Sequence, residues 1–213
     1  FAPEHITINN PKRFSLLYAP IHRTYTASVN ENMEIPEPQP YARNKWENPK
    51  AAEANMALLR AWQKKWPGPS FEYEYHFWRA HLKDPGGQYV ARRIYEDIRG
   101  LKYVKLDGYV EDGSQRSAFP NGFPVYIYAE TLMNRDCDFD AVRADYFEHI
   151  YGKDWEKVDA VLKDVSNAFD FAYMEGARSI DEEVSMYYDP KRVPRLDAVH
   201  DMAARLRFLF NPH

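Results

Sequence analysis

The sequence is poor in cysteine, in long apolar runs and in charge of one sign. Cys137 is the single cysteine of the 213 residues, which excludes an internal disulfide and a metal site built from several cysteines. No apolar run approaches the ~20 residues that span a membrane, and the N-terminus has no signal-peptide pattern. The 28 basic and 32 acidic residues leave a net charge of -4. We therefore expect neither a nucleic-acid partner nor a membrane partner.

The same absences say little about the compartment. A lone cysteine fits a reducing, cytoplasmic setting slightly better than a secreted one. The chain opens with FAPEH and has no initiator methionine, so we expect a fragment or a processed product. A secreted parent protein therefore stays an alternative to a cytoplasmic one.

Apolar side chains make up 45% of the residues and aromatic ones 15%, which is enough for a sizeable core. Their spacing predicts strands at 14–21, 71–78 and 104–110, with helices between them at 49–66 and 88–103. Alternating strands and helices are typical of parallel βαβ units. Helical patterns then follow at 124–134, 139–152, 154–172 and 195–210. The sequence thus predicts an α/β portion, residues 1–122, followed by an all-helical C-terminal subdomain, residues 123–213.

The octapeptide FEYEYHFW, residues 71–78, alternates two kinds of side chain. One side carries Phe71, Tyr73, Tyr75 and Phe77, and the other carries Glu72, Glu74, His76 and Trp78. Charged groups along one side of such a strand have two interpretations. They meet water on the open face of an antiparallel sheet, or they line a functional mouth between parallel strands. The flanking βαβ pattern argues for parallel strands.

Four short motifs occur in order along the chain: 17-LYAPIHR-23, 73-YEYHF-77, 108-GY-109 and 113-GSQR-116. In this combination the chain resembles the DUF4838 family of bacterial proteins, whose larger chains are similar to glycoside hydrolases built on a TIM barrel. The resemblance covers most of the chain. It implies that the three strands are the C-terminal part of a (β/α)8 TIM-type barrel whose earlier strands are absent.

Three strands cannot close a barrel, which needs about eight. Open strand edges invite association. We therefore expect the sheet to associate with the N-terminal barrel portion or with a second copy of the chain, unless the helical tail covers it.

In such a barrel the active site lies at the carboxyl ends of the strands. With the aromatic side toward the helices, Glu74, His76 and Trp78 would look into the barrel near its mouth. The catalytic candidates are Glu74, Glu111 and Asp112, because glycoside hydrolysis needs two carboxyl groups roughly 5–10 Å apart. The substrate-binding candidates are His22, Arg23, Tyr75, His76, Trp78, Tyr109, Gln115 and Arg116.

Two of these assignments have plainer alternatives. The tripeptide Glu111-Asp112-Gly113 is typical of a solvated turn, and for Glu111 alone we favour the turn. Arg116 would bind a sugar carboxylate or hydroxyl, but it would equally cap a helix of the tail.

The sequence therefore predicts part of a glycoside hydrolase that acts on a glycan by carboxylate acid/base chemistry. The expected partner is a carbohydrate, and we expect no cofactor and no metal. The chain alone is expected to be inactive because it lacks the rest of the barrel. One alternative is a non-catalytic carbohydrate-binding or structural module. Another is a helical interaction module, which predicts an exposed apolar patch on residues 139–172.

Overall fold

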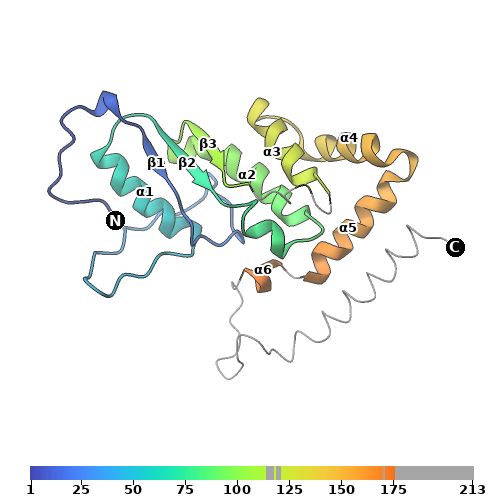
Figure 1. Ribbon diagram of the computed structural model, residues 1–213, viewed down its shortest axis with the longest axis horizontal. Helices are drawn as coiled ribbons and strands as arrows, with labels where there is room; N and C mark the ends of the chain where they lie inside the picture. Colours follow the sequence, from blue (N-terminus) through green and yellow to red (C-terminus); the bar gives the residue numbers. More distant parts are fainter. Residues whose placement is uncertain (114–117, 119–120, 170, 176–213) are drawn as a thin grey trace, which may run out of the picture.

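The computed structural model describes residues 1–113, 118, 121–169 and 171–175. Within them, strands and helices alternate at first: β1 (Leu16–Tyr18), α1 (Ala52–Lys65), β2 (Ser70–Glu74), α2 (Gln88–Val104) and β3 (Gly108–Glu111). The described residues after β3 form α3 (Phe123–Met133), α4 (Phe139–Tyr151), α5 (Trp155–Phe169) and α6 (Phe171–Met174). Short 3₁₀ helices are η1 (Pro11–Arg13), η2 (Ala80–Lys83) and η3 (Gly152–Asp154). The predicted α/β portion followed by a helical region is confirmed (Figure 1).

The three strands form one parallel sheet in the order β1-β2-β3. In the middle of the sheet, Glu72 of β2 pairs with Tyr18 of β1 on one side and with Tyr109 of β3 on the other. The prediction of parallel strands is thus confirmed. The strands are short, at three to five residues, and the described residues form no closed barrel.

The third strand begins later than its apolar run predicts. Residue Val104 still belongs to α2, which ends at Lys105 in a left-handed conformation. The amide of Leu106 then donates to the carbonyl of Leu101 at 3.1 Å. Val104 and Leu106 are buried in a hydrophobic cluster under the sheet. Because these contacts favour the helix and the turn after it, the strand begins only at Gly108.

Two sequence signals for helix ends in the helical region are confirmed. Asp138 precedes α4, and its carboxylate accepts a hydrogen bond from the amide of Ala141 at 2.7 Å. Such a side chain satisfies one of the free amides at a helix start. Gly152 follows α4 with a positive φ of 60°, a conformation that glycine adopts readily.

Helices α1 and α2 pack against the same face of the sheet. Strand residues Leu16, Tyr18 and Tyr109 pack there against a buried cluster from the two helices and the segments beside them. The cluster comprises Val29, Met56, Leu59, Leu101, Val104 and Leu106. By register, Glu72 and Glu74 lie on this helix-facing side.

The opposite face of the sheet is apolar and partly open. It carries Leu17, Phe71, Tyr73 and Val110, of which Leu17 is 48% exposed and Val110 is 41% exposed. The predicted facing of β2 is therefore wrong: the carboxylates face the helices and the aromatic rings face outward. The helix-facing side can accept Glu74 because Arg23, from the segment after β1, pairs with it there and is itself held by Asp97 of α2.

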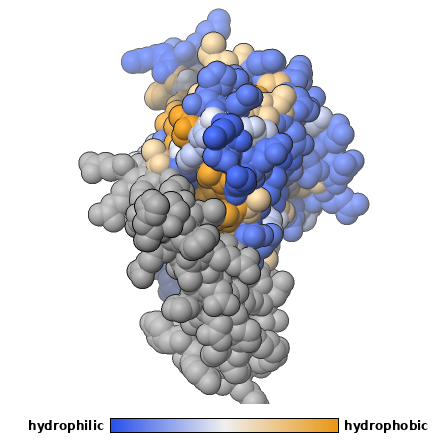
Figure 2. Space-filling model, turned by 90° about the vertical axis from the view of Figure 1, so that its right-hand side faces the viewer, coloured by the Kyte–Doolittle hydropathy of each residue, from blue (hydrophilic) through white to orange (hydrophobic). Residues whose placement is uncertain are grey.

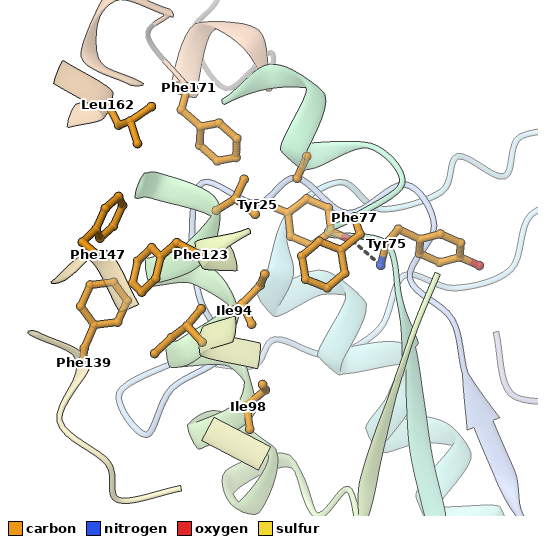
Figure 3. Close-up of a cluster of buried hydrophobic side chains, with 14 residues drawn as sticks. Tyr25, Tyr75, Phe77, Ile94, Ile98, Phe123, Phe139, Phe147, Leu162 and Phe171 are labelled. Atoms are coloured by element: carbon orange, nitrogen blue, oxygen red, sulfur yellow. Dashed lines mark hydrogen bonds between the residues drawn. The ribbon is translucent and has the colours of Figure 1, made fainter. Parts of the chain in front are cut away.

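A second cluster joins the α/β portion to the helical region. The cluster contains Ile94 and Ile98 of α2 together with Phe123 of α3. Phe139 and Phe147 of α4 pack on the same cluster beside Phe123 (Figure 3). Since this core draws on both sides of the boundary proposed at 122/123, α3 is packed directly on α2.

The end of the molecule that carries α4 and α5 is mostly hydrophilic (Figure 2). Charged residues of α4 and η3 such as Asp140, Glu148 and Lys153 are exposed there. Among residues 139–169, Ile150 is the one large apolar side chain that is strongly exposed, at 59%. The described part of residues 139–172 therefore gives little support to an apolar interaction patch.

Close packing of α2 gives a first prediction. A Cβ added to Gly100 would lie 2.0 Å from the carbonyl oxygen of Val29, so the backbone must move. We expect Gly100→Ala to lower the free energy of unfolding by about 1–3 kcal/mol, the usual cost of overpacking, although alanine favours helices. Urea unfolding measures this. Gly113→Ala is the matched control, because its Cβ would meet nothing within 4 Å, and equal stability of the two variants would contradict the packing.

Candidate functional site

Arg23 is the centre of a buried ionic network at the carboxyl end of the sheet. It lies just after β1, and its guanidinium donates to Glu74 at 2.6 Å and to Asp97 at 2.8 Å. Glu74 ends β2, whereas Asp97 comes from the middle of α2. All three side chains are buried, with at most 1% of each exposed. Arg23 therefore ties a strand end to the helix layer through two carboxylates.

His76 extends the network to β3. Its Nε2 lies 3.0 Å from a carboxylate oxygen of Asp97, and its Nδ1 lies 3.1 Å from Glu111. Burial alone would lower the pKa of His76, but Glu111 and the hydrogen bonds to both carboxylates raise it to about 10. The imidazole is thus charged at neutral pH and bridges α2 and β3.

The pKa of Asp97 moves in the opposite direction. Burial would raise it, but Arg23 and His76 lower the pKa of Asp97 to about 2. Its carboxylate also accepts the backbone amide of Val29 at 2.7 Å. Asp97 therefore stays ionised and fixes the segment after β1 as well.

Two tyrosines complete the network, and the buried carboxyl group of Glu72 lies near it. Tyr25 donates its hydroxyl to Glu74 at 2.5 Å and accepts the amide of Tyr75 at 3.2 Å. Tyr109 of β3 lies within 3.5 Å of His76, and burial raises the pKa of both tyrosines. Burial also raises the pKa of Glu72, with repulsion from Glu74 adding to it.

This network has the properties of a structural ion cluster. The side chains of Glu74 and His76 are 0% exposed, and that of Glu111 is 5% exposed. The two oxygens of Glu74 are bonded to Arg23 and Tyr25. A general acid must reach the substrate oxygen that it protonates, and these groups have no open path to one. Buried charges that pair in this way instead hold a fold in register.

A second group of predicted residues lies on the open side of the same edge. Burial and the nearby carboxylate of Asp112 both raise the pKa of Tyr73. Tyr75 packs edge-on against Tyr73 with 5.3 Å between ring centroids, and Trp78 lies 5.7 Å from Tyr75. The ring of Tyr75 points away from the phenylalanine cluster (Figure 3). These four residues, Tyr73, Tyr75, Trp78 and Asp112, are called the edge site below.

Access distinguishes three of the four edge-site residues from the ionic network, whereas Tyr75 is buried, with 9% of it exposed. Trp78 is 44% exposed, and Tyr73 and Asp112 are half-buried. Arg79 lies over the Trp78 ring at 5.5 Å and donates to the carbonyl of Ile21 at 2.9 Å. The tryptophan is thus held in place while one side of it meets solvent.

The structure divides the predicted site residues between these two groups. Arg23, Glu74, His76, Tyr109 and Glu111 belong to the ionic network, whereas Tyr75, Trp78 and Asp112 belong to the edge site. His22 is exposed after β1. Gln115 and Arg116 lie outside the described residues.

Three residues of these groups were missed by the sequence prediction. Asp97 left a signal, because it is a charged residue within the apolar stripe of α2 that holds Ile94, Ile98 and Leu101. Tyr25 lies in a loop with no pattern around it. Tyr73 was assigned to the helix-facing side, and only the register of β2 corrects that.

Neither a metal site nor a membrane span is found among the described residues. No group of three or more His, Cys, Asp or Glu there could hold a metal ion. No described helix is long and apolar enough to cross a bilayer. Comparison with protein-family models, with curated proteins and with solved structures finds no match to this chain.

The central role of Arg23 gives a second prediction. Arg23→Met leaves Glu74 and Asp97 buried without their cation, so we expect the free energy of unfolding to fall by about 3–5 kcal/mol. Urea unfolding followed by circular dichroism measures the loss. Arg79→Met is the control, because Arg79 bonds to a carbonyl and to an exposed ring only. A loss for Arg23→Met no larger than that of the control would contradict a structural network.

The raised pKa of His76 gives a third prediction. Protonated His76 stabilises the fold, because its pKa in the folded state lies above the value of about 6.5 expected when unfolded. This stabilisation is complete below that unfolded value and is lost as the pH rises toward about 10. We expect the free energy of unfolding to decrease across this window in the parent, and to change much less in His76→Gln. Equal pH slopes for the two proteins in denaturant titrations would show that His76 does not carry the charge.

Proposed function

We propose that this chain binds a glycan at the edge site, on the face of the sheet opposite α1 and α2. The observation that supports this best is the group of packed rings Tyr73, Tyr75 and Trp78 at the carboxyl end of β2, with Asp112 directly after the neighbouring parallel strand β3. In open parallel sheets, ligands bind outside the carboxyl ends of the strands. The edge site has that position.

The chemistry of the edge site suits a sugar. The apolar face of a pyranose packs on flat rings, and Trp78 presents one with 44% of its surface exposed. A carboxylate such as Asp112 accepts hydrogen bonds from sugar hydroxyls, and tyrosine hydroxyls both donate and accept them. Tyrosine and tryptophan rings are apolar along the body and polar at the tip. They therefore offer a sugar both an apolar contact area and a hydrogen-bonding group that orients it.

We further propose that the sheet is part of a larger (β/α)8 barrel, of the kind implied by the resemblance to the DUF4838 family. Parallel strands with both helices on one side leave the other side to face the interior of such a barrel. That side carries Leu17, Phe71 and Val110, which are apolar and partly open. Additional strands or a second copy of the chain would cover them.

If the whole protein hydrolyses its glycan, Asp112 is the best candidate here for one of the two carboxyl groups. It is the predicted catalytic residue that lies on the open side, next to Tyr73. Glu74 and Glu111 are occupied by Arg23, Tyr25 and His76. The second carboxyl group would then come from strands of the barrel other than these three. A carbohydrate-binding module without catalysis uses the same edge site and stays the alternative.

Substitution of Trp78 gives a fourth prediction. We expect Trp78→Ala to weaken glycan binding about tenfold, since stacking on one ring contributes about 1 kcal/mol or somewhat more. Stability should change little because the ring is exposed. Isothermal titration calorimetry of the chain with oligosaccharides of glucose, N-acetylglucosamine and glucuronic acid measures the affinity.

The control for this experiment is Trp46→Ala. Trp46 is also half-buried, but it lies in the loop before α1 and packs near Phe1. Tyr73→Phe should weaken the same binding severalfold by removing a hydroxyl that can hydrogen-bond to the sugar. A loss of affinity in Trp46→Ala as large as in Trp78→Ala would contradict a sugar site on the open edge. So would a loss of affinity that appears only in Glu74→Gln.

A further inference from the structure

A cavity of about 470 Å³ opens at the amino edge of the sheet, away from the edge site. It lies between the last turns of α1 and α2 and the residues that lead into β2. Arg60, Lys64 and Lys105 contribute to its wall, and no carboxylate lines it. Cavities of this size accommodate small-molecule ligands.

The three cations of the cavity are not neutralised by the protein. Within the part of the chain that the structure describes, the side chains of Arg60, Lys64 and Lys105 form no ion pair and no hydrogen bond. Arg60 and Lys64 are one helical turn apart on α1, a spacing at which like charges repel. All three side chains are exposed, so solvent surrounds their charges and an anion can reach them.

Carboxylates beside the cavity are already engaged elsewhere. Asp107 accepts the backbone amide of Ser70 at 2.9 Å, and Glu31 accepts the hydroxyl of Tyr103 at 2.7 Å. Neither carboxylate lines the cavity. The charged residues that line the cavity are therefore all cations.

The backbone at Lys105 gives a second, independent observation. Lys105 has φ 57° and ψ 48°, a left-handed conformation that costs a residue with a side chain about 1–2 kcal/mol. Glycine or asparagine usually follows a helix in this way. The amide of Gln63 donates to the carbonyls of Val104 and Lys105, at 2.8 and 3.1 Å, and fixes the turn. A lysine is thus kept at a position where glycine would be less strained.

The helix dipole explains only part of this arrangement. Cations near a helix C-terminus are favoured by its partial negative charge, and this accounts for Lys64 and for a positive residue near the end of α2. It does not account for Arg60, which lies a turn before the end of α1, or for the strained backbone of Lys105. Recognition of an anion accounts for both.

We propose that this cavity binds a tetrahedral anion, the phosphate or sulfate group of a small molecule. Arg60 presents a planar fork that suits two oxygens of such a group. Lys64 and Lys105 add point charges from α1 and from the end of α2. This site is independent of the edge site and of glycan binding.

Calorimetric titration with inorganic phosphate, pyrophosphate and sulfate, at constant ionic strength set with chloride, tests the proposal. We expect saturable binding of at least one of them, strongest for pyrophosphate, and the order of phosphate and sulfate identifies the preferred group. Arg60→Gln and Lys105→Gly should each weaken binding about tenfold, the effect of one charge-assisted hydrogen bond. Lys105→Gly should not lower the unfolding midpoint, because glycine relieves the positive φ.

The charge-matched control is Lys153→Ala, an exposed lysine in η3. It should bind the anions as the parent does. Absence of saturable binding at millimolar anion would overturn the proposal. So would equal affinities of the parent, Arg60→Gln and Lys105→Gly, because the binding would then lie elsewhere on the surface.

Discussion

The ion pair between Arg23 and Asp97 is the contact on which the arrangement of the α/β portion depends. It joins the segment after β1 to the middle of α2, and each partner carries a further bond, to Glu74 and to His76 respectively. Buried charges are tolerated only when they are paired and hydrogen-bonded. With Arg23 in this position, Glu74 faces the helices, and the alternation of β2 then turns Phe71 and Tyr73 to the opposite face.

The facing of β2 in turn decides which residues a ligand can reach. The same strand supplies a structural face, with Glu72 and Glu74, and an accessible face, with Tyr73. The edge site and the ionic network are therefore separated by the thickness of one sheet. The cationic cavity lies at the other end of the strands, between the last turns of α1 and α2.

The order and type of the elements could be predicted from the sequence, because a change of apolar period is a local property of the chain. The facing of the octapeptide could not. Both of its sides carry large side chains, and the choice between them is made by Arg23 and Asp97, which lie 51 residues before and 23 residues after Glu74 in the chain. Asp97 within the apolar stripe of α2 was the available signal, since a lone charge there requires a buried partner. Likewise, the apolar pattern at Val104 and Leu106 is typical of both a strand and a helix end. Only their tertiary contacts decide between the two.

A nuclear magnetic resonance titration of the chain with oligosaccharides tests the separation of the two faces most directly. The account predicts that shifts concentrate on the amide and side-chain signals of Tyr73, Tyr75, Trp78 and Asp112, while the signals of His76 and Asp97 stay in place. Shifts centred on Arg23, Glu74 and His76, with the open face unchanged, would contradict it.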